Sequence, residues 1–234
     1  MSVPDANIHP VATGFAAETV AKHQAPQELV FYAGWFCPYV QRAWITLEEK
    51  GIPYQYKEVN PYKKEKHFLE INPKGLVPAV EYKGKALYES LIICEFLEDA
   101  YPTYGPHLLT TDPYTKAYVS IWVDYITKNV VPNFMRLVQA QEREKQEHAR
   151  QDFYKGLRGV SEKVKGPYFL DNRGYSREDV GEKWASWAGE LEKRDSVLHT
   201  QSNKEYYAEI YGRYLRDEAQ SEAAKAIREG RAIP

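Results

Sequence analysis

The chain has 234 residues, two cysteines and a formal net charge of −2, with a pI near 6.3. Because the charge is nearly balanced and no long basic run occurs, nothing electrostatic favours nucleic acid as the main partner. Two cysteines do not form a disulfide framework and are typical of a reducing compartment. The apolar stretches are too short to span a membrane, and residues 1–27 lack the continuous apolar core of a secretory signal. We therefore expect a cytoplasmic protein.

Residues 1–27 are interpreted as an N-terminal arm, and the first regular pattern follows them. Leu29 to Ala33 is a short apolar run of strand-forming residues, which Gly34 interrupts. Cys37 then opens a segment whose apolar residues recur at helical spacing, and Gly51 ends it. A cysteine at the start of a helix meets unpaired backbone N–H groups and the positive end of the helix dipole, both of which stabilise a thiolate. The pattern predicts a reactive sulfur with a pKa well below the value of about 8.5 for free cysteine.

Two interpretations of Cys37 remain open at this point. Most free cysteines are small buried hydrophobic residues, and Cys94, which lies in an apolar segment, is interpreted in that way. Pro38 favours a reactive Cys37, because proline fits the first helical position and leaves the cysteine just outside the helix. Val40 occupies the position of the second cysteine in a C-x-x-C motif. Any redox chemistry must therefore use one protein thiol, with the second sulfur supplied by a small molecule.

The following residues complete a small α/β domain. We expect a strand at 54–59, a helix at 63–71, a hairpin at 78–88 and a helix from Ser90 to about residue 100 that Ser90 caps. A βαβ unit followed by ββα predicts a thioredoxin-like domain over residues 28–101.

The second half of the chain has only helical patterns. Proline and glycine mark a linker at 102–111, and Asp112-Pro113 has the sequence of a helix start. We expect helices at 117–149, 151–165, 177–199 and 204–229, with a capping-box pattern at 176–179. The prediction is an α+β protein with two domains, in which an all-helical domain at 112–234 follows the thioredoxin-like one.

These segments resemble cytosolic glutathione transferases, and the omega class with a fungal-like, cysteine-type site in particular. The resemblance is carried by FCPYVQRAWITLEEKGIPY, INPKGLVPAVEYKGKALYESLIICEFLEDAYP and TDPYTKA, and it is close over residues 28–120. C-P-Y alone is shared with glutaredoxins and chloride channel-like proteins, whereas L-V-P followed by E-S is characteristic of glutathione transferases. The resemblance implies that glutathione is the co-substrate and that no metal is used.

The resemblance also implies a glutathione-binding site. Pro78 would be cis and would expose the backbone of Val77 to the cysteinyl backbone of glutathione. Ser90 would bind the γ-glutamyl carboxylate, and Glu89 would accept from the α-amino group. Lys64 would face the glycyl carboxylate, although a solvated lysine face is an equally open interpretation. The implied set is Cys37, Pro38, Tyr39, Lys64, Val77, Pro78, Glu89 and Ser90.

The activity that the resemblance implies is glutathione-dependent thioltransfer. Cys37 would attack a glutathionylated substrate, and a second glutathione would resolve the mixed disulfide. Thioltransferase, deglutathionylating and dehydroascorbate reductase activities are all implied, and the sequence does not rank them. One alternative is a ligandin with little or no turnover that binds aromatic or polyphenolic compounds, because the chain has 19 tyrosines and five tryptophans. A weaker alternative is an interaction or channel-forming protein.

The acceptor substrate is expected to bind between the two domains. The candidate residues are Trp35, Tyr39, Trp122, Tyr125, Asn129, Trp184 and Trp187. Aromatic residues at helical spacing more often pack in a core, which is how we interpret Tyr118, Ile121, Trp122 and Tyr125. From the resemblance we also expect a homodimer with one glutathione site per subunit.

Overall fold

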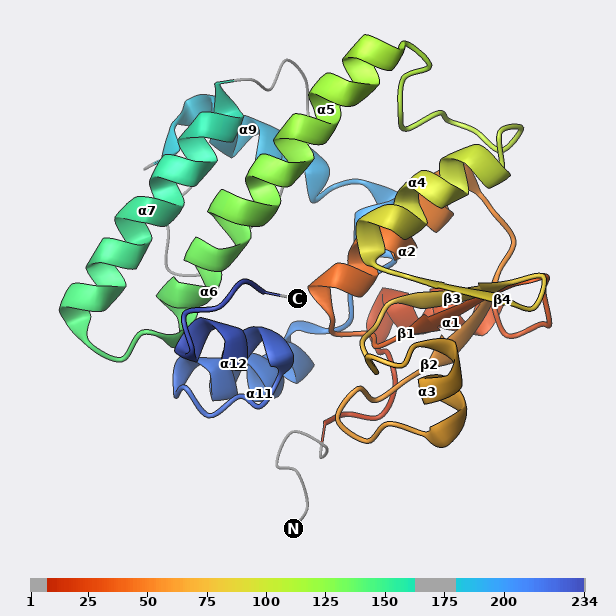
Figure 1. The fold of residues 1–234 in the computed structure, drawn as a ribbon, viewed down its shortest axis with the longest axis horizontal. Coiled ribbons are helices and arrows are strands. Elements are labelled where there is room, and N and C mark those ends of the chain that lie inside the picture. The colour runs from red at the N-terminus through yellow and green to blue at the C-terminus, as the bar shows by residue number, and fades with distance from the viewer. Residues whose placement is uncertain (1–7, 163–179, 234) are drawn as a thin grey trace. The chain divides into compact units, whose positions relative to one another are not determined.

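The computed structural model describes residues 8–162 and 180–233 (Figure 1). The chain divides into two compact units, Met1–Thr110 with Asp195–Tyr207 and Thr111–Arg194 with Ala208–Pro234. The first unit contains all the strands of the described residues, and the second is helical. The predicted α+β fold class is confirmed.

The first unit is built on a mixed four-stranded sheet. Its elements are α1 (Gly14–Lys22), β1 (Leu29–Ala33), α2 (Pro38–Lys50), β2 (Gln55–Glu58), α3 (Lys66–Ile71), β3 (Ala79–Tyr82), β4 (Lys85–Tyr88), α4 (Ser90–Ala100) and α10 (Asp195–Leu198). The strand order is β2-β1-β3-β4, with β1 parallel to β2 and antiparallel to β3, and β3 antiparallel to β4. This is the predicted thioredoxin-like order of a βαβ unit followed by ββα.

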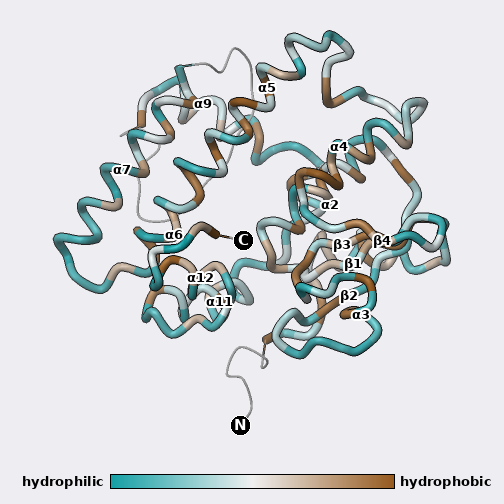
Figure 2. Tube along the Cα trace, in the orientation of Figure 1, coloured by the Kyte–Doolittle hydropathy of each residue, from teal (hydrophilic) through white to brown (hydrophobic). Residues whose placement is uncertain are grey.

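Apolar periodicity explains the core of this unit. Val40, Ala43, Trp44 and Leu47 recur on one face of α2, and each is fully buried. Helix α2 packs beside α4 (Figure 1). Figure 2 shows hydrophobic stretches along the strands and on these two helices. The helical spacing read from the sequence therefore identifies the buried face of α2.

The N-terminal arm and a late segment both belong to the first unit. The arm, for which the sequence predicted no regular structure, contains helix α1. The N–H of Thr13 donates to Oγ of Ser202 at 3.0 Å, and the N–H of Asn203 donates to Oγ1 of Thr13 at 3.0 Å. The predicted boundary therefore differs from the observed one, because residues 195–207 cluster with the first unit. The contacts of Thr13 with Ser202 and Asn203 join residues far apart in the sequence, so no local sequence pattern could have predicted them.

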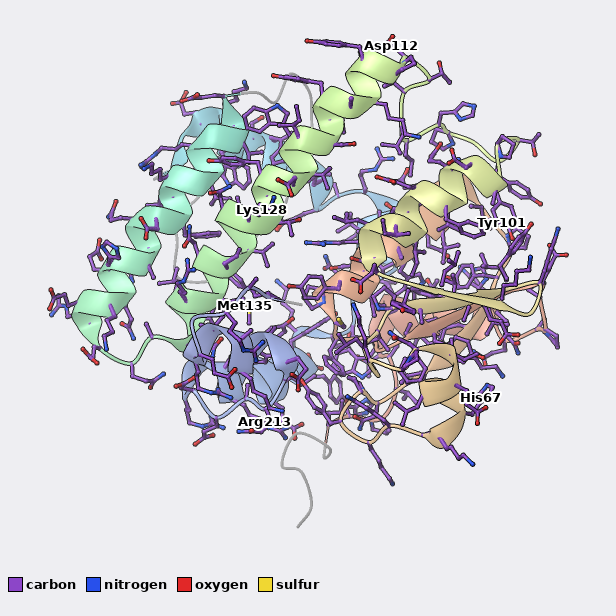
Figure 3. All side chains as sticks on the ribbon, in the orientation of Figure 1. His67, Tyr101, Asp112, Lys128, Met135 and Arg213 are labelled. Carbon is purple, nitrogen blue, oxygen red and sulfur yellow. The ribbon has the colours of Figure 1, made fainter. Side chains whose placement is uncertain are left out.

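The second unit is made of helices. They are α5 (Pro113–Tyr125), the π-helical segment η2 (Ile126–Val130), α6 (Val131–Gln139), α7 (Arg143–Ser161), α9 (Glu182–Leu191) and α12 (Glu222–Arg228); α11 (Lys204–Leu215) begins in the first unit and ends in the second. Asp112 is the N-cap of α5 as predicted, and its carboxylate accepts from the N–H of Thr115 at 2.7 Å (Figure 3).

No helix of the described ranges is both long enough and apolar enough to cross a membrane. The predicted capping box at 176–179 lies outside the described residues.

The predicted long helix at 117–149 is wrong. The π-helical segment leads directly into α6, and Pro132, which has no backbone N–H to donate, lies in the first turn of α6. Ala140 is extended, and its φ and ψ of −61° and 131° end α6. The amide of Gln141 donates to the carbonyl of Leu215 at 2.9 Å. This tertiary contact is made in the break, and the helix-forming charged sequence gave no sign of it.

One cluster forms the core of the second unit. Its buried members are Val130, Phe153, Tyr154, Leu157, Val160, Val180, Trp184 and Trp187. The side chains of Tyr125, Ile126, Phe134, Leu137 and Leu191 pack against it.

A buried ion pair lies beside the segment after α4, and its lysine also binds the backbone of that segment. Nζ of Lys50 lies 3.1 Å from Oε1 of Glu98, and the two side chains are 0% and 7% exposed. Lys50 also donates to the carbonyls of Tyr104 and Pro106, at 3.0 and 3.4 Å. Burial alone would raise the pKa of Glu98, but hydrogen bonds from the N–H of Leu108 and from Lys50 outweigh it and hold this pKa below its ordinary value.

We predict that Lys50→Met lowers the free energy of unfolding by about 3–5 kcal/mol, because Glu98 is left buried without its cation. The double variant Lys50→Met/Glu98→Leu should recover most of that loss, since it leaves no buried charge. Urea denaturation followed by circular dichroism measures both. In the control Lys83→Met, which breaks an exposed pair with Glu28, the change should stay within about 0.5 kcal/mol. Equal losses in Lys50→Met and Lys83→Met would contradict this account.

Candidate functional site

Cys37 lies in the turn between β1 and α2. Its N–H donates to the carbonyl of Gly34 at 2.9 Å, and it is the N-cap residue of α2 with Pro38 next. The side chain is half-buried, and its Sγ lies 3.8 Å from the carbonyl oxygen of Val77, to which the thiol donates. The predicted position of the cysteine, just outside the helix, is confirmed.

Opposing effects act on the Cys37 thiol. Burial raises its pKa, whereas the N–H groups of Val40 and Tyr39 and the guanidinium of Arg42 act in the opposite direction. The net shift is upward. The prediction of a lowered pKa is therefore wrong for this structure, because desolvation outweighs the helix start. The hydrogen bond to Val77 also favours the protonated thiol.

The segment that carries Val77 is a tight loop before β3. The peptide bond between Val77 and Pro78 is cis, as predicted. The side chain of Asn72 donates to the carbonyl of Leu76 at 2.8 Å and orders the loop internally. Val77 itself is buried, with 8% of its surface exposed. The loop thus brings a backbone carbonyl to the sulfur of Cys37.

Lys64 lies against the same loop. Gly75 has a left-handed φ of 64°. A Cβ added there would come within 2.5 Å of Cδ and 2.9 Å of Nζ of Lys64. The side chain of Lys64 therefore lies across Gly75, two residues before Val77. This contact distinguishes Lys64 from its lysine neighbours, which the sequence could not do.

The turn between β4 and α4 holds Glu89 and Ser90. Glu89 has a φ of 77°, a left-handed conformation that is strained for a non-glycine residue, and it occupies the N-cap position of α4. The prediction that Ser90 caps α4 is wrong, because Ser90 is the first residue of the helix. Its Oγ instead accepts from Nη1 of Arg42 at 3.5 Å.

Glu89 is paired within the chain. Its Oε1 accepts from Nζ of Lys74 at 2.7 Å, and the two side chains are 47% and 53% exposed. Exposed pairs contribute roughly 0–1 kcal/mol. An incoming ammonium group could therefore share or replace Lys74 at little cost.

Arg42 is a site residue that the sequence analysis missed. It donates to Ser90, its Cζ lies 4.9 Å from the centre of the Tyr39 ring, and its charge lowers the pKa of Cys37. A signal was present, since Arg42 follows Tyr39 by three residues and shares its helix face. Arg42 thus links the first turn of α2 with the start of α4.

The predicted acceptor residues are divided between the two units. Trp35 is 3% exposed, and Trp184 and Trp187 belong to the core of the second unit. Large aromatic side chains of this kind supply much of a core. The part that these three residues play in acceptor binding stays a prediction.

The remaining acceptor candidates are half-buried or exposed. Tyr125 packs against the core of the second unit, Trp122 and Tyr39 are half-buried, and Asn129 is exposed. The prediction that Tyr118 and Ile121 lie in the core is wrong, since they are 45% and 62% exposed.

Comparisons with known proteins show what the whole chain is similar to. The model of the glutathione S-transferase N-terminal domain matches residues 36–100. Glutathione S-transferase omega-1 of Sus scrofa is 36% identical over 168 residues, which are 67% of this chain and 68% of that protein. The crystal structure of glutathione transferase Omega 3C from Trametes versicolor is 64% identical, with a TM-score of 0.83 over 90% of this chain and 100% of that one. Rice GST1, whose structure is a complex with glutathione, is 26% identical with a TM-score of 0.72, over 81% of this chain and 99% of that one.

A thioredoxin-like unit with this loop and these relatives defines the class, and the chain belongs to the glutathione transferase family. Within that family it is a member of the omega class.

We predict that Arg42→Met raises the pH midpoint of Cys37 alkylation by about half a unit or more, because a nearby positive charge is removed. Arg42→Lys should restore part of the shift. Iodoacetamide labelling across a pH series, followed by mass spectrometry of the Cys37 peptide, measures the midpoint. Lys83→Met, which removes an exposed charge that pairs with Glu28, is the control and should leave the midpoint unchanged. An unshifted midpoint in Arg42→Met would show that this guanidinium does not act on the thiol.

Proposed function

We propose that this omega-class enzyme is a glutathione-dependent thioltransferase and deglutathionylating reductase that works through a mixed disulfide between Cys37 and glutathione. The observation that carries the proposal is the 3.8 Å approach of Sγ of Cys37 to the carbonyl of Val77. A tripeptide that pairs with the Val77 backbone as an added strand would carry its own sulfur to this cysteine.

The two carboxylates and the α-amino group of glutathione would also have partners of matching chemistry. The hydroxyl and N–H of Ser90 suit the γ-glutamyl carboxylate, since Ser90 lies in the first turn of α4. Glu89 suits the α-amino group and Lys64 the glycyl carboxylate. The rice relative that was solved with glutathione supports this tripeptide as the co-substrate.

The reaction has two sulfur exchanges. The thiolate of Cys37 attacks the glutathionyl sulfur of a mixed disulfide, a Cys37–glutathione bond forms, and the substrate thiolate leaves and takes up a proton. The thiolate of a second glutathione then attacks the same glutathionyl sulfur, which releases oxidised glutathione and Cys37. The net change is reduction of one mixed disulfide by one glutathione. Reduction of dehydroascorbate would use the same cysteine and is a further activity proposed from the family resemblance.

Binding of glutathione would itself activate the thiol. In this structure the thiol of Cys37 donates to the carbonyl of Val77, which favours its protonated form. An added strand would occupy that carbonyl with the cysteinyl N–H and remove the acceptor of the thiol. The N–H groups of Val40 and Tyr39 and the charge of Arg42 would remain. The pKa of Cys37 should therefore fall when glutathione binds.

We also propose a homodimer with one glutathione site in each subunit. None of the residues of α5, all of which are described, is buried. On this helix Tyr114, Tyr118 and Ile121 are 79%, 45% and 62% exposed. An exposed apolar face of this kind is typical of an interaction surface.

A cytoplasmic location stays a prediction of the sequence.

Incubation of the protein with oxidised glutathione should add one glutathionyl group to Cys37 and none to Cys94, as measured by intact and peptide mass spectrometry. Both cysteines are half-buried, but only Cys37 lies at a helix start. Cys37→Ser should abolish the adduct and the thioltransferase activity, because a serine oxygen cannot exchange sulfur. Cys94→Ser is the matched control and should keep both.

Cys37→Ser also separates the enzyme from the alternative, a ligandin for aromatic compounds. A ligandin would bind aromatic compounds equally well in wild type and variant and would show no cysteine-dependent turnover in either. Full thioltransferase activity in Cys37→Ser would overturn the proposed mechanism.

Ile121→Glu should shift the protein from dimer to monomer at micromolar concentration, because it places a charge in an apolar contact. Light scattering coupled to gel filtration measures the mass. The control Leu69→Glu changes an exposed apolar residue of α3, which is 38% exposed, and should leave the mass unchanged. A wild-type monomer, or an unaltered dimer in Ile121→Glu, would refute this interface.

A further inference from the structure

Hydrogen bonds made by Trp35 hold the turn that carries Cys37. The backbone N–H of Trp35 donates to Oε1 of Glu58 at 3.0 Å, and its indole Nε1–H donates to the carbonyl of His9 at 2.9 Å. Trp35 is 3% exposed and makes an edge contact with Tyr207, with ring centroids 5.2 Å apart. The residue two positions before the cysteine is therefore held by the end of β2 and by the N-terminal arm.

Glu58 has little freedom to leave this position. It is the last residue of β2 and lies opposite Ala33 in the parallel ladder. Its Oε2 accepts from the hydroxyl of Tyr56 at 2.9 Å. The N–H of Val59 donates to the carbonyl of Ala33 at 2.7 Å, which ties the next residue to the end of β1. Each carboxyl oxygen of Glu58 thus has a fixed donor.

The carboxyl of Glu58 changes its charge near neutral pH. Burial raises its pKa to about 7, against the lowering effect of the Trp35 N–H and the Tyr56 hydroxyl. Among the described residues, Tyr56 of the same strand is the titratable side chain that contacts it, and Tyr207 of α11 in turn acts on Tyr56. The ring of His9 in the arm makes an edge contact with Trp35, with ring centroids 6.4 Å apart. A carboxylate accepts a stronger hydrogen bond than a neutral carboxyl group.

We propose that Glu58 is a positioning residue for Cys37, and that its charge determines how firmly the Cys37 turn is held around neutral pH. The proposal rests on the proposed role of Cys37 as the nucleophile. Glu58 acts through the N–H of Trp35 and has no direct contact with glutathione or the reacting sulfur in the proposed reaction.

The same carboxyl has the opposite effect on global stability. As the pH rises, the turn is held more firmly, but the free energy of unfolding decreases. The ordinary glutamate pKa is about 4.3, and in the folded protein the pKa of Glu58 is higher. The stability that its protonated form contributes is complete at low pH and is lost as the pH rises to about 7. Above that pH the ionised carboxylate holds the turn more firmly at a cost in global stability. Glu58→Gln should therefore gain in melting temperature relative to wild type as the pH rises.

The first experiment follows the amide proton of Trp35 by NMR in a pH titration of the full chain. In wild type its chemical shift should change with a midpoint near 7, the pKa of its acceptor. In Glu58→Gln, which keeps an acceptor oxygen but has no charge, the step should be absent. A flat wild-type titration, or the same step in Glu58→Gln, would overturn the proposal.

The second experiment asks whether the held turn matters to the sulfur. The rate of alkylation of Cys37 by iodoacetamide is measured over the same pH series in both proteins. Wild type should show a step near pH 7 in addition to the ionisation of the thiol, and Glu58→Gln should lose this step with a change in rate of roughly two- to tenfold. Identical profiles would show that Glu58 has only a structural role. Neither readout needs turnover, so failure here is distinct from failure of the proposed thioltransferase activity.

Tyr56→Phe keeps the test decisive if Glu58→Gln does not fold. It removes the hydroxyl that donates to Oε2, and with it one of the two groups that lower the pKa of Glu58. The steps in the Trp35 shift and in the alkylation rate should then move together to higher pH. Steps that stay at the wild-type midpoint would overturn the proposal.

Discussion

The sulfur of Cys37 lies where burial and the helix start oppose each other, and the rest of the site is arranged around that balance. Desolvation favours the neutral thiol, which donates to the carbonyl of Val77. The backbone N–H groups of α2 and the guanidinium of Arg42 favour the thiolate. A thiol held protonated in this way resists oxidation until a ligand takes its acceptor, since only the thiolate reacts. This hydrogen bond would therefore protect the thiol for which the nucleophilic role is proposed.

This balance requires a fixed backbone on both sides of the sulfur. On one side, Asn72 orders the loop that presents Val77, and Lys64 covers Gly75. On the other side, Glu58 and the arm hold Trp35. The fold supplies these supports from β2, from the loop before β3 and from the N-terminal arm. Because β1 ends and the antiparallel β3 begins at the same edge of the sheet, the fold brings Cys37 close to the carbonyl of Val77.

Several site residues have two partners, and this connects binding with reactivity. Arg42 contacts Ser90 and also lowers the pKa of Cys37. The carbonyl of Val77 accepts from Cys37 and is also the group proposed to pair with glutathione. Occupation of the proposed tripeptide site would therefore change the hydrogen bonding of the sulfur directly. Such coupling needs no domain motion, because all of these residues lie in the first unit.

The sequence by itself determined the features that depend on a few neighbouring residues. Apolar spacing identified the buried face of α2, Asp112-Pro113 marked the start of α5, and the position of Cys37 before Pro38 followed from the proline. The cis bond before Pro78 came from the family resemblance. Tertiary structure decided what depends on distant partners: the helix in the arm, the break between α6 and α7, and the core position of Trp184. It also decided the charge balance at Cys37, because desolvation depends on everything packed around the sulfur, and no local pattern records it.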